Sequence, residues 1–541
     1  MNKKWWFGTA MATVMVSSVL VGCGGGEKTG AGDKQELHLV IGDDVPSMDP
    51  SKATDEYSFD MLSATLEGLV RLDKDGNAQP GLASKWEVSD DAKTYTFTLR
   101  DGLKWSNGDA VTAKDFEYSW KRTLNPDTGS QYSFMLFWVK GASAYNSGTG
   151  SADQVGVQAV DDKTLKVTLE NPTPFFLNQM AFPTFYPQNQ KFVEEQGDKY
   201  GSSPETILSV GPFQVKEWVR DASITLTKSD TYWDKDAVKL DSVTFQVVKD
   251  SNSAVNMYDA GEIDRVGLVR EHIDRFKDTP EYTQVPELTN GYLIFNPTVK
   301  GLDNAKIRKA LTYAVDRDMY ADIIYHNGTV GATGFVPVGT SDSAGGQFRD
   351  DAGDTLPKVS ADDAKKLFEE GLKEVGMTAS DFKLKLLVDD SDVARKAAEF
   401  LQEQWKTKLG IAVDPEAVPF KLRLQRESKM DYQVGISLWG ADYNDPMTFL
   451  DLFVSGGDFN KVGYKSEQYD KLIQEAKVTS DVKKRAQLLV EAEKVLMDDM
   501  PVGPIFFRGR AYATKPYVKN FVSFPYGVGF DLKTTYIEGK E

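Results

Sequence analysis

The sequence predicts an α/β fold divided into several lobes, and three observations support this prediction. Short apolar runs typical of strands alternate with amphipathic segments typical of helices. Hydrophobic residues make up 40% of the chain and charged residues 27%, which is typical of globular proteins. With 541 residues, the chain is too long for a single hydrophobic core. At about 100–200 residues per domain, roughly two to four lobes are expected.

The first half of the chain carries predicted strands and helices in alternation. A short apolar run bounded by turn residues predicts a buried strand at 37–41, and apolar residues on one face predict a helix at 57–72. Alternating polarity predicts a half-exposed strand at 94–100, and Thr112 is a candidate N-cap for the helix that follows. Further strands are expected at 164–169, 224–227 and 243–248.

The second half has longer helical segments separated by strands. Strands are predicted at 383–388 and 432–438. No repeat with a period of about 20–50 residues is present, which argues against solenoids and propellers. The predicted helices span residues 305–315, 361–375, 393–409 and 482–497.

Charge and residue usage exclude several functional classes. Lys and Arg number 63 against 81 Asp and Glu, and the net charge of −18 repels nucleic acid. Cys23 is the only cysteine and the chain has 3 histidines, so disulfides and multi-histidine metal sites lack ligands. The common phosphate-binding, zinc-helix and nucleophile-elbow motifs are missing. We therefore expect no cofactor, no metal and no nucleic-acid partner.

The first 33 residues have the features of a targeting segment. Lys3 and Lys4 precede an apolar stretch that is short for a membrane span, so residues 1–22 are predicted to be a signal peptide. Residues 20–23 (LVGC) resemble the lipobox of bacterial lipoproteins. That resemblance implies cleavage before Cys23, lipidation of its sulfur and a Gly-rich tether over 23–33. An unprocessed helix with an incidental cysteine is the alternative.

Short motifs follow one another in a fixed order along almost the whole mature chain. The most specific block is YTFTLRDGLKWSNG at 95–108, followed by TAKDF at 112–116. In order and spacing, the motifs resemble the large oligopeptide-binding family among the extracytoplasmic solute-binding proteins of ABC importers. The other motifs are VPSMDP (45–50), EGLV (67–70), PGLASKW (80–86), GPF (211–213), YWD (232–234), GEID (261–264), IRKAL (307–311), AVDR (314–317) and WGADYNDP (439–446).

This resemblance implies a type II periplasmic-binding-protein-like fold, with two main mixed-sheet lobes joined by a hinge and one extra inserted lobe. Lobe I is expected to comprise residues 34–56, 198–295 and 508–541. Lobe II, the inserted lobe, spans 57–197, and lobe III spans 296–507. The ligand is expected between lobes I and III, which close over it by a hinge motion.

Asp442 is the principal candidate site residue. It follows the predicted strand, at the end where α/β proteins often carry ligand contacts. From the residues alone, Asn444 and Asp445 before Pro446 favour an Asx turn instead. The family resemblance implies that Asp442 binds the α-ammonium group of a peptide.

The resemblance also assigns roles to residues around the ligand. It implies that Leu438 and Gly440 pair with the peptide backbone, and that Asp44 and Pro46 flank its other side. Pro46 has no N–H and can only accept a hydrogen bond there. Tyr132 is expected to line the cleft. Main-chain pairing of this kind suits a protein that accepts many peptide sequences.

One departure from the family concerns ligand length. Relatives that hold very short peptides place a basic residue and a histidine to receive the ligand carboxylate. Ile436 and Ala394 stand at the matching positions. Arg395 is adjacent to Ala394, but neighbouring side chains on a helix point about 100° apart. We therefore do not expect ligands restricted to three or four residues.

The sequence thus predicts a lipid-anchored, extracytoplasmic binding protein, of the Gram-positive surface type, that captures oligopeptides and delivers them to an ABC importer. Its expected partners are peptides, the permease subunits and the membrane, and the protein is expected to be a monomer without catalytic residues. The alternatives are a peptide pheromone, dipeptide, metal chelate or saccharide as ligand, or a signalling peptide receptor. A surface-anchored hydrolase with a carboxylate pair is the alternative from another class.

Overall fold

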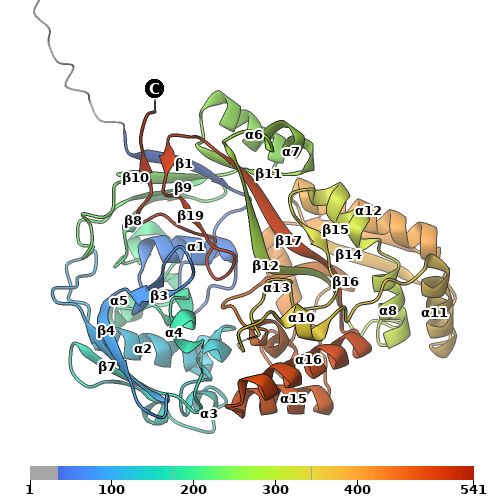
Figure 1. Cartoon of the computed structure of the whole chain (residues 1–541), viewed down its shortest axis with the longest axis horizontal. Coiled ribbons are helices and arrows are strands. Elements are labelled where there is room, and N and C mark those ends of the chain that lie inside the picture. Colours follow the sequence, from blue (N-terminus) through green and yellow to red (C-terminus); the bar gives the residue numbers. More distant parts are fainter. Residues whose placement is uncertain (1–33, 174, 343, 541) are drawn as a thin grey trace, which may run out of the picture.

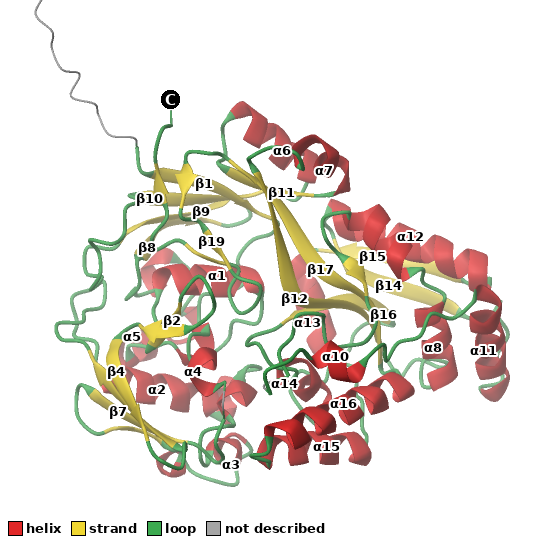
Figure 2. Ribbon diagram, viewed as in Figure 1, coloured by secondary structure: helices red, strands yellow, loops and turns green. Residues whose placement is uncertain are grey.

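The computed structural model describes residues 34–173, 175–342 and 344–540 (Figure 1). The predicted signal peptide, Cys23 and the tether lie outside this part. None of the helices within it has the length and apolar character that a membrane crossing requires. The chain is a mixed α/β protein with three sheets of four or more strands and three short two-stranded sheets (Figure 2). The fold class predicted from the sequence is correct.

The first large sheet lies in the segments assigned to lobe I. Its strand order is β1-β10-β9-β8, with β1 parallel to β10 and the other pairs antiparallel. The C-terminal segment runs beside this sheet (Figure 1), where Gln35 Nε2 donates to the carbonyl of Ile537 at 2.9 Å. Elements here are β1 (Glu36–Ile41), β8 (Phe213–Val219), β9 (Ser223–Lys228), β10 (Ser242–Val247), α6 (Ser251–Ala260), α7 (Arg270–Phe276), β18 (Val518–Lys519), β19 (Val522–Ser523), β20 (Phe530–Asp531) and β21 (Tyr536–Ile537).

The second sheet, with order β4-β5-β7-β6, is entirely antiparallel and lies within residues 57–197. Strand β5 alternates half-buried and buried residues, as its sequence predicts. Helix α2 begins after Thr112, whose backbone N–H donates to the Asp115 carboxylate at 2.7 Å. The elements are β2 (Val70–Leu72), β3 (Ala78–Pro80), β4 (Ala83–Val88), β5 (Thr94–Leu99), α2 (Ala113–Leu124), α3 (Ala142–Asn146), β6 (Val157–Ala159), β7 (Thr164–Thr168), α4 (Phe176–Gln179) and α5 (Gln190–Gln196).

The third sheet has the order β11-β17-β12-β16-β14-β15, with β13 paired to β17. Helices α8, α11 and α12 pack on it through a core that includes Leu293, Leu386 and Trp405. The elements are β11 (Arg265–Leu268), β12 (Tyr282–Phe295), α8 (Ala305–Tyr313), α9 (Arg317–Tyr320), β13 (Val330–Gly331), α10 (Phe348–Ala352), α11 (Ala361–Glu374), β14 (Lys383–Asp389), α12 (Asp392–Leu409), β15 (Ala412–Val418), α13 (Phe420–Ser428), β16 (Val434–Gly440), α14 (Met447–Leu450), α15 (Glu467–Val478), α16 (Val482–Asp499) and β17 (Val502–Thr514).

The predicted division into lobes can be placed on these sheets. The whole first sheet lies in the expected lobe I, and the whole second sheet lies in lobe II, residues 57–197. Strands β14, β15 and β16 of the third sheet lie in lobe III. The expected boundary after residue 295 falls at the end of β12, and the one after 507 falls inside β17. Strands β11, β12 and β17 carry the third sheet across the expected boundary between lobes I and III. The long strands β12 and β17 therefore connect the expected lobes I and III (Figure 1).

The helix predicted at 57–72 is shorter than expected. Helix α1 spans Glu56–Thr65, and the residues from Val70 onward form β2 instead. The carbonyl of Thr65 accepts hydrogen bonds from the backbone N–H groups of Val210 and Gly211, at 3.1 and 2.9 Å. A Cβ on Gly211 would lie 2.7 Å from the nitrogen of Leu66, so only glycine fits there. A long-range contact thus ends α1, which local periodicity does not predict.

Candidate functional site

A cavity of about 280 Å³, called here the central cavity, lies between the third sheet and the end of β1. Its walls come from α1, β12, β16, α13 and β17, together with Gly42 and Asp43 after β1 and the segment 524–529. Segments from all three expected lobes therefore contribute to it. Of the predicted site residues, Tyr132, Leu438, Gly440 and Asp442 line this cavity.

Asp442 has little access to solvent, with an exposed fraction of 6%. Tyr132 Oη donates to one carboxylate oxygen at 3.4 Å, and Thr448 Oγ1 lies 3.5 Å from the other. The Asp442 backbone N–H donates to Thr448 Oγ1 at 3.1 Å. In the described part of the chain, no Lys, Arg or His side chain forms an ion pair with Asp442.

Burial raises the pKa of Asp442 well above its usual range, although the hydrogen bonds from Tyr132 and Thr448 oppose this shift. A buried carboxylate without a cation is unfavourable in its charged form, so it either takes up a proton or acquires a positive partner. The site is therefore suited chemically to receive a cationic group from the cavity.

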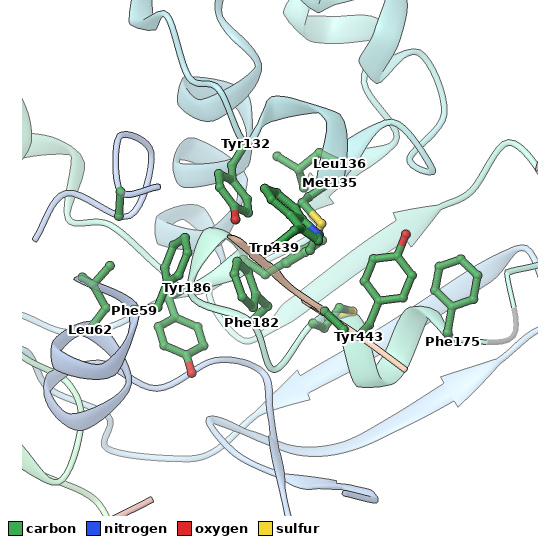
Figure 3. Close-up of a cluster of buried hydrophobic side chains, with 14 of the residues drawn as sticks. Phe59, Leu62, Tyr132, Met135, Leu136, Phe175, Phe182, Tyr186, Trp439 and Tyr443 are labelled. Atoms are coloured by element: carbon green, nitrogen blue, oxygen red, sulfur yellow. The ribbon is translucent and has the colours of Figure 1, made fainter. Parts of the chain in front are cut away.

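Aromatic rings surround Asp442 and its partner Tyr132. The Tyr132 ring lies parallel to the Trp439 ring, with centroids 6.1 Å apart, and the edge-on Phe459 ring is 5.0 Å from it. Figure 3 shows Tyr132 and Trp439 side by side, with Phe59 and Phe182 nearby. The indole N–H of Trp439 is buried and has no hydrogen-bond partner in the described structure. Such rings stabilise a nearby cation through their faces.

Strand β16 presents an unpaired edge to the cavity. On one side it pairs with β12 along its full length, including Leu438 with Gly291. On the other side β14 reaches only Val434 and Gly435. In the described residues no strand covers positions 436–440 on that side. Main-chain N–H and C=O groups at such an edge can pair with an extended ligand.

Asp44 and Pro46 are not among the residues that line the central cavity. The Asp44 carboxylate accepts hydrogen bonds from Trp218 Nε1 at 3.1 Å and from Arg220 Nη1 at 3.2 Å. Gly42 and Asp43 take the positions in the cavity wall instead. The structure thus places the end of β1 beside the cavity through Gly42 and Asp43, which precede both predicted residues.

The sequence did not reveal a charged network in the cavity wall. Glu56, at the start of α1, bonds to Arg508 Nη2 at 2.9 Å and to Arg510 Nη2 at 2.6 Å, and both arginines also pair with Glu287. Burial, and then the charge of Glu56, raises the pKa of Asp60 to about 8. Arg508 and Arg510 are two residues apart, so in a strand their side chains point to the same face of the sheet. The sequence analysis predicted no strand at 502–514.

Comparison with known proteins identifies the family. Residues 77–461 match the model described as bacterial extracellular solute-binding proteins, family 5, middle region. The chain belongs to this family. The resemblance inferred from its motifs is therefore confirmed.

Individual members of family 5 match over nearly the full length. The oligopeptide-binding protein OppA of Bacillus subtilis is 39% identical over 524 residues, which cover 94% of each chain. Listeria monocytogenes OppA bound to peptide is 37% identical, with a TM-score of 0.90 over 94% of this chain and 100% of that one. The pheromone receptor PrgZ is 34% identical, with a TM-score of 0.89 over 94% and 100%.

Family 5 structures in different conformations match this chain to different degrees. The TM-score with the Escherichia coli murein tripeptide-binding protein MppA is 0.86, but with its unliganded open form the score is 0.60. The arrangement of this chain is therefore more similar to the first of these structures than to the unliganded open form. The expected lobes I and III are in direct contact: Lys249 Nζ lies 2.9 Å from the Asp390 carboxylate, and Ser251 Oγ lies 2.8 Å from the Asp392 carboxylate.

Proposed function

We propose that this chain is a lipid-anchored substrate-binding protein that captures oligopeptides outside the cytoplasm and delivers them to an ABC importer. Family membership and the OppA relatives support the peptide ligand and the transport role. The observation that carries the proposal is Asp442, a buried carboxylate that faces the cavity without a cation in the described structure. A free peptide N-terminus supplies the missing positive charge.

The proposed binding mode follows from the cavity walls. The ammonium group meets Asp442 beside Tyr132, and the peptide backbone extends along the open edge of β16 at Leu438 and Gly440. Backbone pairing is independent of side chains, so it accepts many sequences. The same arrangement requires no catalytic group, and the ligand leaves chemically unchanged.

The first experiment is native mass spectrometry of the purified protein, followed by calorimetry. We expect co-purified peptides of varied sequence, and much weaker binding of an N-acetylated peptide than of the same peptide with a free amine. Acetylation removes the charge that Asp442 receives. Equal affinities for the two forms would reject the ammonium site.

The same experiment separates the alternative ligands. The relative PrgZ is a pheromone receptor, so a single peptide species among the bound ligands would favour a pheromone or signalling role. Very short species would favour a dipeptide. A saccharide or metal chelate lacks the ammonium group and would bind equally well after Asp442 is neutralised. Cleaved products of an added peptide would favour the hydrolase alternative.

The lipid anchor is tested separately, because Cys23 lies outside the described residues. We expect the Cys23→Ala variant to fold and bind peptide normally but to lose membrane association, since a single diacylated cysteine provides the anchor. Fractionation of cells into membrane and soluble parts measures this. A variant that stays with the membrane would contradict lipidation at Cys23.

A further inference from the structure

The wall of the central cavity carries more acidic than basic side chains. Eight Asp or Glu residues and four Lys or Arg residues line it. A cavity lined mainly by one sign of charge, with walls of low dielectric constant, attracts ligands of the opposite sign. In the proposed function, Asp442 receives the α-ammonium group of the peptide. The remaining excess of carboxylates favours a ligand with further positive charge.

Most of these carboxylates already have partners within the chain. Glu56 and Glu287 form ion pairs with Arg508 and Arg510, so this network of two acidic and two basic groups is balanced. The others with partners are Asp43 with Lys249, Asp389 and Glu427 with Arg423, and the N-cap Asp55 with Ser58. In the described structure, only Asp60 and Asp442 are neither in an ion pair nor at a helix cap.

Asp60 stands one helical turn after Glu56 on α1 and lines the central cavity. Its Oδ1 accepts a hydrogen bond from the backbone N–H of Gly529 at 2.7 Å. Burial, together with the charges of Glu56 and Glu287, raises the pKa of Asp60 to about 8, although the Gly529 N–H and Arg510 oppose this shift. The chain therefore supplies one neutral donor to this carboxylate and too little positive charge to keep it ionised at neutral pH.

A glycine-containing segment connects Asp60 to the loop that carries Asp442. The Gly527 N–H donates to the carbonyl of Ala441 at 2.7 Å, and Gly529, which binds Asp60, is two residues later. Two residues of chain span at most about 7 Å, which places the two carboxylates within roughly 15 Å of each other. Two or three extended residues of a peptide, with the long stem of a Lys or Arg side chain, cover such a distance.

We propose that Asp60 binds the side-chain cation of a Lys or Arg residue near the N-terminus of the peptide, so that the protein prefers basic peptides. This inference rests on the proposed peptide-binding function and adds a preferred class of peptide to it. Asp442 receives a charge that every free peptide has, whereas Asp60 receives a charge that only some peptides have. The cation stabilises the ionised carboxylate, so Asp60 releases its proton to the solvent on binding.

The test is calorimetry with a six-residue peptide that has a free N-terminus and one lysine, placed at position 1, 2, 3 or 4. Each peptide is compared with its counterpart in which the lysine side chain is acetylated. For at least one position, we expect lysine to bind the wild-type protein about 10- to 100-fold more tightly, as for a hydrogen bond between charged groups. Asp60→Asn should abolish this preference. The asparagine oxygen still accepts the Gly529 N–H, so the segment is held as before.

Two further variants control this result. Asp75→Asn removes the same charge from an exposed carboxylate, paired with Lys74 between β2 and β3, and it keeps the full preference. Asp60→Glu keeps the charge on a longer side chain and retains part of the preference. Melting temperatures establish that all variants fold.

Proton release separates a ligand contact from a structural role of Asp60. In buffers of different ionisation enthalpy at pH 7, the preferred lysine peptide should release more protons from the wild-type protein than its acetylated counterpart does. In Asp60→Asn this difference should vanish. A carboxyl group that only holds Gly529 would release no additional proton when the lysine peptide binds.

Equal wild-type affinities for the lysine and acetyl-lysine peptides at all four positions would overturn this inference. So would a preference that Asp60→Asn retains in full, because another group would then bind the side chain. The wild-type comparison and the proton count need no variant, so they decide the matter even if Asp60→Asn does not fold. Failure of the proposed function has a different appearance: no peptide of the series, with or without lysine, would bind to the wild-type protein.

Discussion

Asp442 and Asp445 stand three residues apart in the same loop after β16, and both are buried. Arg485 of α16 binds the Asp445 carboxylate through both terminal nitrogens, at 2.7 and 2.8 Å, and Asp445 also accepts from the Met447 N–H. Asp442 interacts only with the hydroxyl groups of Tyr132 and Thr448 in the described structure. One carboxylate is thus neutralised within the chain and the other is not.

This difference indicates which aspartate is structural and which is available to a ligand. A charge paired by the protein stabilises the folded state, and its removal affects stability. A charge that the protein leaves unpaired, at the wall of a cavity, makes the empty protein less stable and favours a ligand of opposite charge. Substitutions at these two aspartates and at their partners therefore separate the two roles.

The largest effect is expected from breaking the Asp445–Arg485 pair. Arg485→Met leaves Asp445 buried without its cation, which costs about 3–5 kcal/mol of unfolding free energy. Denaturant titration measures this. The double variant Asp445→Asn with Arg485→Met should recover much of the stability, because neither charge remains. A single variant as stable as wild type would mean that the pair is dispensable.

Asp442→Ala should reduce affinity for a free peptide while leaving the fold intact. Truncating one partner of a desolvated charge pair costs about 2–5 kcal/mol, or roughly 30-fold to several thousand-fold in affinity. Asp442→Asn should also raise the melting temperature of the unliganded protein at neutral pH, since it removes the cost of either burying the charged carboxylate or protonating it. If Asp442 were only a turn residue, Asp442→Ala would instead lower the unfolding free energy by about 0.5–2 kcal/mol and leave the peptide affinity unchanged.

The raised pKa of Asp442 predicts how pH affects stability and binding. The folded, unliganded state holds the Asp442 carboxyl proton more tightly than the unfolded state does. The contribution of Asp442 to folding stability is therefore complete below the pKa that Asp442 has in the unfolded chain. It is lost as pH rises toward the folded pKa. Peptide binding favours the ionised carboxylate, so affinity should rise with pH until the peptide amine deprotonates near about 8.

Calorimetry in buffers of different ionisation enthalpy tests this linkage. We expect proton release when a free peptide binds to the wild-type protein at pH values below the folded pKa of Asp442. The Asp442→Asn variant should release none at this site. An identical pH profile for both proteins would show that another group titrates on binding.

The smallest effect is expected for Tyr132→Phe. The variant keeps the stacked ring but loses the hydroxyl that donates to Asp442, which costs about 0.5–1.5 kcal/mol in affinity. Tyr232→Phe is a matched control. The Tyr232 hydroxyl donates to the Glu67 carboxylate at a distance of 2.9 Å, and neither residue lines the central cavity. That control should affect stability alone, whereas an equal loss of affinity in both variants would exclude a direct role for Tyr132.

Local patterns predicted much of the fold. The strand at Glu36–Ile41, the alternating strand Thr94–Leu99 and the helix Ala113–Leu124 follow from residue periodicity and a cap, which depend on neighbours in sequence. The motifs identified the family, and through it directed attention to Asp442. All of these signals are contained in short stretches of chain.

Contacts between distant residues decided the rest. The end of α1 depends on Gly211, the neutralisation of Asp445 on Arg485, and the position of Asp44 on Trp218 and Arg220. The sequence by itself determined the fold class, the family and the identity of the candidate anchor. Only the tertiary structure decided which buried charges find a partner, because an ion pair requires two side chains whose distance in space is unrelated to their separation along the chain.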